Sequence, residues 1–509
     1  MYSTIKTAVI DGICAKMISV EVDISTGMPV FDMVGSLAVE VKEGKERVKT
    51  ALHNCGIMLP AKRMTINLSP AKVRKHGTGF DLPIAIALLV SLGIIEQKQT
   101  ESILFAGELG LNGQLLPIPG ILPIVSDAKK EGVCKFFVPT DNLGEARLVQ
   151  GVQCYGFSSL KEVLAFFQEN RYHEPQIDVQ RKEETSALDF SEVYGQSYLK
   201  RVCEISAGGM HNLLMIGPPG AGKTMISERI ATILPPLCPK EQLELAKIYS
   251  VCGKMETMKA LPKNRPFRSP HHTITKAGLI GGGRYPKPGE ISMAHHGILF
   301  LDELPEFQKN TLEVLRQPME EKCVHIGRAE FVVDYPADFL LIASMNPCAC
   351  GNYPDMQKCR CTPGNIRKYL SNISQPLLDR MDLCVEAPRV RYEELRGGGK
   401  QENSQIIRSR VMECHELQRN RFLGEGFSYN SQIPAPLLEK YCKLGTKEER
   451  YLHTIYEKMG LTARTFHKLL RVARTIADME KSNRVKLSHL NEAVCYRSVD
   501  EKYWGGICG

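Results

Sequence analysis

Residues 211–224 read HNLLMIGPPGAGKT, an apolar run followed by a glycine-rich loop that ends in lysine and threonine. This order fits the P-loop, in which a strand leads into backbone N–H groups that surround phosphate oxygens. Lys223 would reach the β and γ phosphates of a nucleotide, and Thr224 would hold Mg²⁺. The predicted phosphate-binding residues are Gly217, Pro218, Pro219, Gly220, Ala221, Gly222, Lys223 and Thr224. The segment therefore predicts a site for ATP and magnesium.

Two later apolar strands end in the polar groups that such a site needs. Residues 298–303 read ILFLDE, so a buried strand is followed by Asp302 and Glu303. Asp302 would complete the magnesium site, and Glu303 would polarise the attacking water. Residues 339–346 read FLLIASMN and end in Asn346, which can orient that water against the γ-phosphate. The combination predicts an enzyme that hydrolyses ATP.

Two arginines further along the chain favour assembly into a ring. The sequence QPLLDRMD at 375–382 places Arg380 after a helix, where it can complete a neighbouring subunit's site as an arginine finger. Arg464, which ends the sequence TAR, can sense the γ-phosphate from a C-terminal helix. For either arginine alone, a solvated surface charge is the competing interpretation.

The chain divides into blocks of different composition. Residues 1–166 alternate short apolar strands with helical stretches, which predicts an α/β domain. Residues 167–188 are polar and charged, as in a linker. The block at 189–387 predicts an αβα P-loop core, and residues 388–509 carry apolar positions at helical spacing, as in a helical lid domain. The predicted fold class is therefore α/β and multidomain.

Composition excludes several classes of protein. The 509 residues are 43% hydrophobic and 24% charged, as in ordinary soluble proteins. The longest apolar run, residues 82–95, is too short to cross a bilayer, and residues 1–12 lack the pattern of a signal peptide. We therefore expect a cytoplasmic protein with no membrane partner, whose 17 cysteines are mostly reduced.

The formal net charge of +8 permits a nucleic-acid partner without requiring one. The densest basic run of the chain lies between Lys42 and His76 and contains nine Lys or Arg residues and two Glu. A solvated face and a surface that tracks phosphates are equally good interpretations of this run.

Four cysteines follow Asn346 in two close pairs, Cys348 with Cys350 and Cys359 with Cys361. Four thiolates can hold a tetrahedral Zn²⁺, and a closed four-sulfur site is structural rather than catalytic. The C-x-C spacing is tighter than the common C-x₂-C spacing, so free thiols are the alternative. The pattern predicts a structural zinc site on a loop that can touch DNA or an adjacent subunit.

Two segments are predicted to contact DNA. Residues 268–287 contain paired histidines, three consecutive glycines and Arg284, which suits a flexible basic loop. Residues 324–333 read VHIGRAEFVV and predict a β-hairpin with Arg328 at its tip. Arg328 is expected to contact a DNA backbone, with Arg284 as a further contact. Packing near the site, rather than metal binding, is expected for His271, His272, His295 and His296.

Several longer strings carry a family resemblance. They are NLLMIGPPGAGKT at 212–224, RPFRSPHHT at 265–273, PGEISMAHHGILFLDE at 288–303 and PLLDRMD at 376–382. The nucleotide block resembles AAA+ ATPases of the magnesium-chelatase and MCM-helicase branch, and nearly the whole chain resembles the YifB/ComM family. The resemblance implies a homo-hexamer with ATP at subunit interfaces, and it implies that Asn346 is sensor 1, Arg380 the arginine finger and Arg464 sensor 2. ComM proteins are understood as DNA helicases that drive branch migration during integration of transforming DNA.

Residues 10–150 resemble the Lon protease domain, an S5-like α/β fold, through GELGLNGQLLPIPG at 107–120 and KHGTGFD at 75–81. In Lon the second string carries a nucleophilic serine, and the segment after the first carries a lysine. Gly79 and Leu122 stand at those places in this chain. The dyad for acyl transfer is missing, so proteolysis is not expected.

Three functions fit these patterns. The leading hypothesis is a hexameric, ATP-driven motor of the branch-migration type that acts on single-stranded or branched DNA. The second is a chelatase-type subunit in which the same ATPase remodels a protein partner, against which the N-terminal domain and the cysteine quartet argue. The third is a nucleotide-switched assembly scaffold, which would not need a hydrolytic set of residues. Dependence of ATP turnover on DNA would separate the first from the others.

Overall fold

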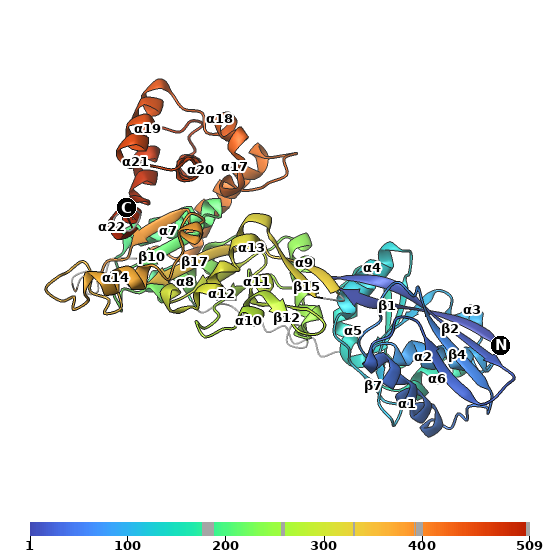
Figure 1. The fold of residues 1–509 in the computed structure, drawn as a ribbon. Coiled ribbons are helices and arrows are strands. Elements are labelled where there is room, and N and C mark those ends of the chain that lie inside the picture. Colours follow the sequence, from blue (N-terminus) through green and yellow to red (C-terminus); the bar gives the residue numbers. More distant parts are fainter. Residues whose placement is uncertain (176–187, 256–259, 329–330, 391, 393–400, 505–509) are drawn as a thin grey trace. The chain divides into compact units, whose positions relative to one another are not determined.

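Figure 1 shows the chain in a computed structural model, which describes residues 1–175, 188–255, 260–328, 331–390, 392 and 401–504. The chain separates into two compact units. The N-terminal unit consists of Met1–Glu183 with Pro239–Pro262, and the P-loop unit consists of Glu184–Cys238 with Lys263–Gly509. Of the predicted linker at 167–188, residues 176–187 lie outside the described residues.

The N-terminal unit is built on a mixed seven-stranded sheet with the order β3-β4-β2-β1-β5-β8-β9. β1, β2 and β4 pair antiparallel, and the other neighbours pair in parallel. Buried residues alternate with more exposed residues along β4, as expected for a strand with one face in the core. The strands are β1 (Tyr2–Asp11), β2 (Cys14–Ser25), β3 (Val30–Val34), β4 (Arg63–Ser69), β5 (Ile103–Phe105), β8 (Lys135–Pro139) and β9 (Gln153–Phe157), with a separate pair β6 (Glu108–Leu109) and β7 (Leu115–Leu116).

The longest apolar run of the sequence forms a core helix. Every residue of α2 (Asp81–Ser91) is buried, so its apolar side chains pack inside the unit. Within the described ranges, no helix combines the length and the apolar character that a membrane span requires. The other helices here are α1 (Val39–Asn54), α3 (Gln97–Thr100), α4 (Ile121–Lys130), α5 (Thr140–Ala146) and α6 (Leu160–Glu169).

One helix from the expected P-loop block folds with the N-terminal unit instead. α9 (Pro239–Val251) packs on α4. The Nζ of Lys247 lies 3.0 Å from the Oδ1 of Asp127, and both side chains are largely buried. The backbone N–H of Gly120 donates to the carbonyl of Ser250 at 3.1 Å. These polar contacts tie α9 to the N-terminal unit.

The P-loop unit contains a five-stranded sheet with the order β11-β14-β17-β10-β18, in which every neighbouring pair is parallel. All residues of β10, β14 and β17 are buried, as in a parallel sheet with both faces covered. Two hairpins, β12–β13 and β15–β16, stand apart from this sheet. The strands are β10 (Leu213–Ile216), β11 (Phe267–Arg268), β12 (Gly281–Gly282), β13 (Lys287–Pro288), β14 (Ile298–Leu301), β15 (Cys323–Arg328), β16 (Phe331–Pro336), β17 (Leu340–Met345) and β18 (Leu383–Glu386).

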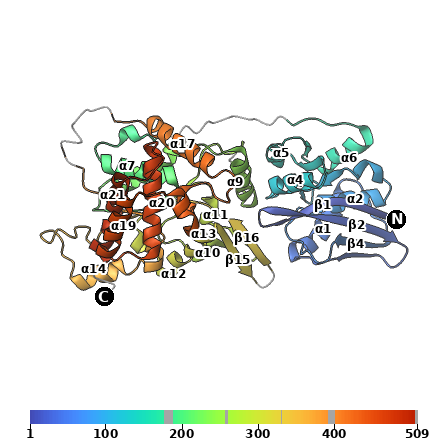
Figure 2. The same cartoon turned by 90° about the horizontal axis from the view of Figure 1, so that it is seen from above.

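The rest of the P-loop unit is mainly helical, and Figures 1 and 2 show its C-terminal helices gathered beside one another. The helices around the sheet are α7 (Ser197–Gly209), α8 (Lys223–Ile233), α10 (Lys276–Ile280), α11 (Glu290–Met293), α12 (Lys309–Glu313), α13 (Arg316–Glu321), α14 (Pro363–Leu370) and α15 (Gln375–Leu378). The C-terminal helices are α17 (Ser404–Arg421), α18 (Leu438–Tyr441), α19 (Thr446–Lys458), α20 (Ala463–Met479), α21 (Leu487–Cys495) and α22 (Ser498–Trp504). The mixed α/β class with a helical C-terminal region is thus confirmed.

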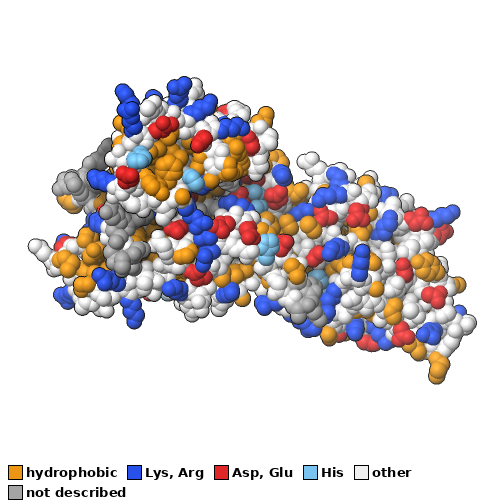
Figure 3. Space-filling model, turned by 45° about the horizontal axis from the view of Figure 1, so that its top comes forward, with side chains coloured by type: hydrophobic (Ala, Val, Ile, Leu, Met, Phe, Trp, Pro, Cys, Tyr) orange, Lys and Arg blue, Asp and Glu red, His pale blue; other side chains and the backbone are white. Residues whose placement is uncertain are grey.

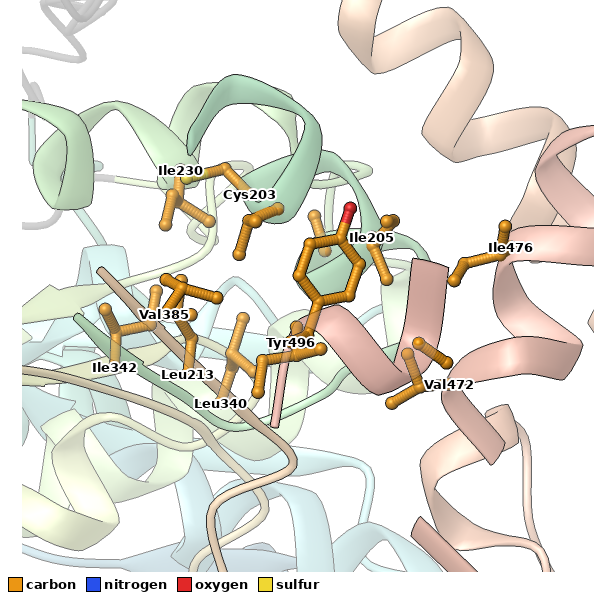
Figure 4. Close-up of a cluster of buried hydrophobic side chains, with 14 of the residues drawn as sticks. Cys203, Ile205, Leu213, Ile230, Leu340, Ile342, Val385, Val472, Ile476 and Tyr496 are labelled. Atoms are coloured by element: carbon orange, nitrogen blue, oxygen red, sulfur yellow. The ribbon is translucent and has the colours of Figure 1, made fainter. Parts of the chain in front are cut away.

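A single apolar cluster joins the sheet to the C-terminal helices (Figure 4). Leu213, Ile342 and Val385 come from three adjacent strands, while Val472 and Ile476 come from α20, and all five are essentially inaccessible to solvent. Burial of each such aliphatic side chain stabilises the fold by roughly 1.5–3 kcal/mol. The cluster therefore holds the C-terminal helices against the layer that carries the P-loop.

Candidate active site

The order of the parallel strands brings the predicted catalytic segments to one edge of the sheet. β10 pairs with β17, and β17 pairs with β14. Because parallel strands end at the same edge, the P-loop, Asn346 and Asp302 emerge side by side. Together they line a cavity of about 390 Å³, bordered by Pro219, Gly220, Ala221, Gly222, Lys223, Thr224, Met225, Asp302, Glu303, Ser344, Met345 and Asn346.

The glycines of the P-loop meet two separate steric demands. A Cβ on Gly217 would lie 2.3 Å from the carbonyl oxygen of Ala387, so no side chain fits where the loop leaves β10. Gly220 and Gly222 have φ angles of +75° and +76°, which L residues rarely adopt. Gly222 immediately precedes α8, so the loop opens onto a helix N-terminus, where backbone N–H groups favour an anion.

Lys223 lies with its amine inside the loop. Its Nζ donates to the carbonyls of Gly217 at 2.7 Å and Pro218 at 3.0 Å, and it lies 3.2 Å from the Oδ1 of Asn346. Burial lowers the pKa of Lys223, and the charges of Asp302 and Glu303 oppose that shift. The amine is thus positioned between the loop and the Asn346 side chain, where a γ-phosphate would be bound.

The Asp302 carboxylate accepts hydrogen bonds from three groups of the site. The hydroxyl of Thr224 donates to its Oδ2 at 2.7 Å, and the backbone N–H of Glu303 donates to its Oδ1 at 3.0 Å. Ser344 also donates its hydroxyl to Oδ1. The Thr224 and Asp302 oxygens lie close enough together to bind one Mg²⁺, which prefers oxygen ligands. Ser344 was missed in the sequence because it stands in a fully buried strand, where no alternation marks one face.

Glu303 is the more exposed of the two acids. Its backbone has a φ of +52°, and 55% of its side chain is accessible. The Nδ1 of His272 lies 3.6 Å from the Glu303 Oε2. His272, which was expected to pack near the site, therefore faces the carboxylate expected to activate water.

Arg380 and Arg464 share one acid. The Nη2 of Arg380 lies 2.6 Å from the Oε1 of Glu320, and the Nη2 of Arg464 lies 3.2 Å from the same oxygen. The Arg380 side chain is 11% exposed and that of Arg464 is 50% exposed. Glu320, on α13, had no distinguishing signal in the sequence, since it is one acid in a charged helix.

A buried ion pair fixes the two segments that carry these arginines. The Nζ of Lys468, one helical turn after Arg464 on α20, lies 3.0 Å from the Oδ1 of Asp382. Both side chains are 8% exposed. Asp382 also accepts from the backbone N–H of Asn212 at 2.9 Å, directly before β10. Helix α20, the Arg380 segment and the strand before the P-loop are therefore tied together.

Comparison with known proteins supplies the family. Residues 189–395 match magnesium chelatase, subunit ChlI, residues 401–497 match the C-terminal part of that subunit, and residues 20–142 match subunit ChlI of Mg-chelatase. The uncharacterized protein YifB of Salmonella typhimurium is 41% identical over 490 residues, which is 96% of each chain. Competence protein ComM of Haemophilus influenzae is 37% identical over 494 residues, again 96% of each chain.

The chain belongs to the YifB/ComM family of magnesium-chelatase-like proteins. The magnesium-chelatase 38 kDa subunit of Rhodobacter capsulatus is a more distant relative, 23% identical over 59% of this chain and 84% of its own length. Family and site together identify this YifB/ComM chain as an AAA+ ATPase.

The cysteine quartet of this YifB/ComM protein is assembled in space. The four sulfurs of Cys348, Cys350, Cys359 and Cys361 all lie within 4.8 Å of one another. The sulfur–sulfur distances are 3.4 Å for Cys348 to Cys350, 3.6 Å for Cys350 to Cys359 and 3.8 Å for Cys348 to Cys359. Zn–S bonds of about 2.3 Å in a tetrahedron place sulfurs about 3.8 Å apart. The donor set therefore fits a four-thiolate metal site.

The two predicted DNA arginines of this YifB/ComM chain lie on hairpins that pack together. Arg328 ends β15, and Arg284 lies in the turn between β12 and β13; both are exposed. A Cβ on Gly282 would lie 3.3 Å from the Nη2 of Arg328, and the Tyr335 hydroxyl donates to the Pro286 carbonyl at 2.6 Å. Residues 329–330, at the tip, lie outside the described residues.

Several charged side chains of the N-terminal unit are buried or paired. Lys75 is buried and donates to the Pro70 carbonyl, and Arg47 makes two hydrogen bonds to the buried Asp81. A Cβ on Gly79 would lie 2.8 Å from the Cδ1 of Ile118, so a side chain there would collide with the core. The basic run between Lys42 and His76 therefore presents fewer free charges than its composition indicates.

On the face drawn in Figure 3, Lys and Arg side chains are interspersed with Asp and Glu over both units. A mixed surface of this kind does not by itself attract a polyanion, so a DNA site would depend on particular side chains.

Proposed function

We propose that this YifB/ComM chain is an ATP-driven DNA motor that works as a homo-hexamer and migrates branched DNA. The observation that carries the proposal is the position of the β15–β16 hairpin in the chain, between β14 and β17. β14 is followed by Asp302 and β17 by Asn346, so the hairpin lies in the segment between two groups of the candidate ATP site. We expect a change at that site to be transmitted to Arg328 along this segment.

The hydrolysis step uses groups of a single chain. Lys223 would bind the β and γ phosphates, and Thr224 and Asp302 would hold the Mg²⁺ that neutralises phosphate charge. Glu303 would take a proton from the attacking water, while Asn346 orients that water. Ser344 holds Asp302 through a hydrogen bond, so the metal-binding oxygen is positioned by the strand itself.

Arg380 would complete the site of the neighbouring subunit, and Arg464 would sense the γ-phosphate. Arg380 would act as the finger that neutralises transition-state charge, and Arg464 would act as sensor 2. Their shared contact with Glu320 places both guanidinium groups on one surface. Two cations held together in this way suit a polyphosphate presented by another chain.

The paired hairpins would contact DNA. Arg328 and Arg284 are exposed on hairpins that touch each other, so both can face the same backbone. Arginine suits this role because its planar guanidinium donates two hydrogen bonds to one phosphate.

The cysteine quartet would bind one structural Zn²⁺. Four thiolates fill a tetrahedral zinc site and leave no position for substrate, so the metal would stabilise the loop at 347–362 rather than catalyse hydrolysis. Lys358 and Arg360 on that loop would then be available to DNA or an adjacent subunit.

The first test is ATP hydrolysis by the wild type and by Lys223→Ala, each without DNA and with single-stranded, duplex or four-way-junction DNA. We expect marked stimulation by DNA, strongest with the junction, and loss of all turnover in the variant. Stimulation should fall as salt rises, because phosphate contacts release counterions. Robust turnover that ignores every DNA would contradict the motor.

The hairpin assignment is tested with Arg328→Ala. We expect about tenfold weaker DNA binding, since one charge-assisted hydrogen bond is worth about 1.5 kcal/mol. Turnover without DNA should not change. Lys447→Ala is the matched control, because it removes an exposed positive charge from α19, away from the hairpins. Equal DNA affinities in both variants would remove Arg328 from the interface.

The alternative is a chelatase-type ATPase that remodels a protein partner. The matches of both blocks of the P-loop unit to ChlI favour it. Dependence of turnover on a protein, with indifference to DNA, would select this alternative.

A further inference from the structure

The cysteine loop, residues 347–362, connects two parts of the nucleotide site. It begins directly after Asn346 at the end of β17 and ends at Thr362, whose hydroxyl accepts from the Asn365 N–H at 3.2 Å to cap α14. Its middle is open to solvent: residues 354–358 are all exposed. The sulfur cluster brings the two ends of this loop together, as a metal site does in small domains that lack an apolar core.

The cysteine loop packs directly against the P-loop. Gly351 follows Cys350 and has a φ of +76°. A Cβ at this position would lie 2.5 Å from the Cδ and 2.9 Å from the Cγ of Pro219. Because a distance below 3 Å is not tolerated between carbon atoms, only glycine allows this approach. A displacement of the cysteine cluster would thus move the surface that supports Pro219.

The helix that follows the loop returns to Asn346. Tyr369, on α14, is hydrogen-bonded to the backbone of Asn346. Burial raises the pKa of Tyr369, and the charges of Glu306 and Glu303 add to that shift. The chain thus leaves Asn346, passes through the cysteines and comes back to the same residue.

We propose that a metal ion bound by the four cysteine thiolates holds the P-loop and Asn346 in register, so that zinc loading controls ATP turnover. This inference rests on the ATP hydrolysis proposed above. Zn²⁺ is the metal that fits, since it prefers tetrahedral sulfur ligands and has no redox chemistry of its own. The metal centre would not touch the phosphates. It would act on the phosphate site through Gly351, which packs on Pro219, and through Tyr369, which is hydrogen-bonded to Asn346.

The test begins with metal analysis of the full-length wild type, for which we expect one zinc per chain. Cys350→Ser and Cys359→Ser should lose the zinc and lower kcat about a hundredfold, the effect of a misplacement of about 1 Å in a site. Cys134→Ser is the control, since this exposed cysteine lies in the N-terminal unit and should leave both quantities unchanged. A wild type with four free thiols and no zinc would overturn the metal assignment.

Gly351→Ala separates the metal from its coupling to the site. It keeps all four cysteines, so it should bind one zinc, while its methyl group pushes against Pro219 and slows turnover. Full zinc with wild-type turnover in this variant would overturn the coupling. Binding of a fluorescent ATP analogue to zinc-loaded and zinc-stripped wild type provides a readout independent of hydrolysis. If the wild type failed to hydrolyse ATP yet its analogue affinity still depended on zinc, the proposed function would fail and the coupling would stand.

Discussion

The phosphate-binding groups and the two arginines are held in different ways. Lys223 and Thr224 begin α8 and Asp302 directly follows β14, and they contact one another or the P-loop. Arg380, which follows α15, and Arg464, on α20, instead both contact Glu320. The first set is arranged to receive a ligand within one chain. The second set is neutralised by a carboxylate of its own chain, which a neighbour's phosphate would have to replace.

The largest expected effect concerns Arg380. Arg380→Ala should bind nucleotide normally but lower kcat about a thousandfold, at the lower end of what an arginine finger contributes. The fault would lie in the neighbour's site, so mixing with Lys223→Ala chains should restore part of the activity. ATP turnover of the mixture at varied ratios is the measurement.

The mixing experiment needs subunit exchange, which fluorescence transfer between labelled chains reports. If chains exchange and no ratio regains turnover, then Arg380 does not serve a neighbour, and both halves of the site belong to one chain. That outcome would erase the distinction between the two sets of residues.

Glu303→Gln tests the part of the site that binds phosphate and activates water. The amide keeps the shape of the side chain but cannot accept a proton, so hydrolysis should slow by about a hundredfold while ATP binding persists. Turnover and binding of a fluorescent nucleotide, measured together, check this. His272→Gln is a useful companion, because His272 is the side chain within 3.6 Å of that carboxylate. Unchanged turnover in Glu303→Gln would assign water activation to another group.

The phosphate half of the site could be predicted from sequence because its geometry is local. A glycine-rich loop between a strand and a helix carries its own backbone requirement, and the sequence places Lys223 and Thr224 directly after it. The acids and Asn346 follow short apolar runs of the length expected for buried strands. Parallel pairing then brings their ends to one edge, as the structure confirms for β10, β14 and β17.

The arginine half could not be predicted in the same way. Glu320 meets Arg380 across 60 positions and Arg464 across 144 positions, and no periodicity relates such distant residues. The buried Lys468–Asp382 pair was hidden for the same reason. The docking of α9 on the N-terminal unit depends on Asp127 and Gly120, which lie far earlier in the chain. Tertiary contacts decide these features, and a local pattern carries no information about them.

The smallest expected effect is the most informative about Glu320. Glu320→Gln removes the charge that neutralises both arginines. The Glu320 and Arg464 side chains are half-exposed, and such an ion pair is worth about 0.2–1 kcal/mol. We therefore expect ATP turnover to rise by up to about fivefold at protein concentrations where assembly is partial, and to match the wild type where assembly is complete. The measurement is turnover against protein concentration. Glu321→Gln is the matched control, since that neighbouring acid contacts His325 and neither arginine.

The sign of the Glu320→Gln effect decides what the carboxylate does. A rise that disappears at high concentration means that Glu320 competes with the phosphate of a neighbouring chain for the same guanidinium groups. A fall at every concentration means that Glu320 positions the arginines in the assembled site, because the loss then persists when every subunit has a neighbour. High salt should shrink the rise, since exposed charges are screened, whereas a positioning defect would survive it.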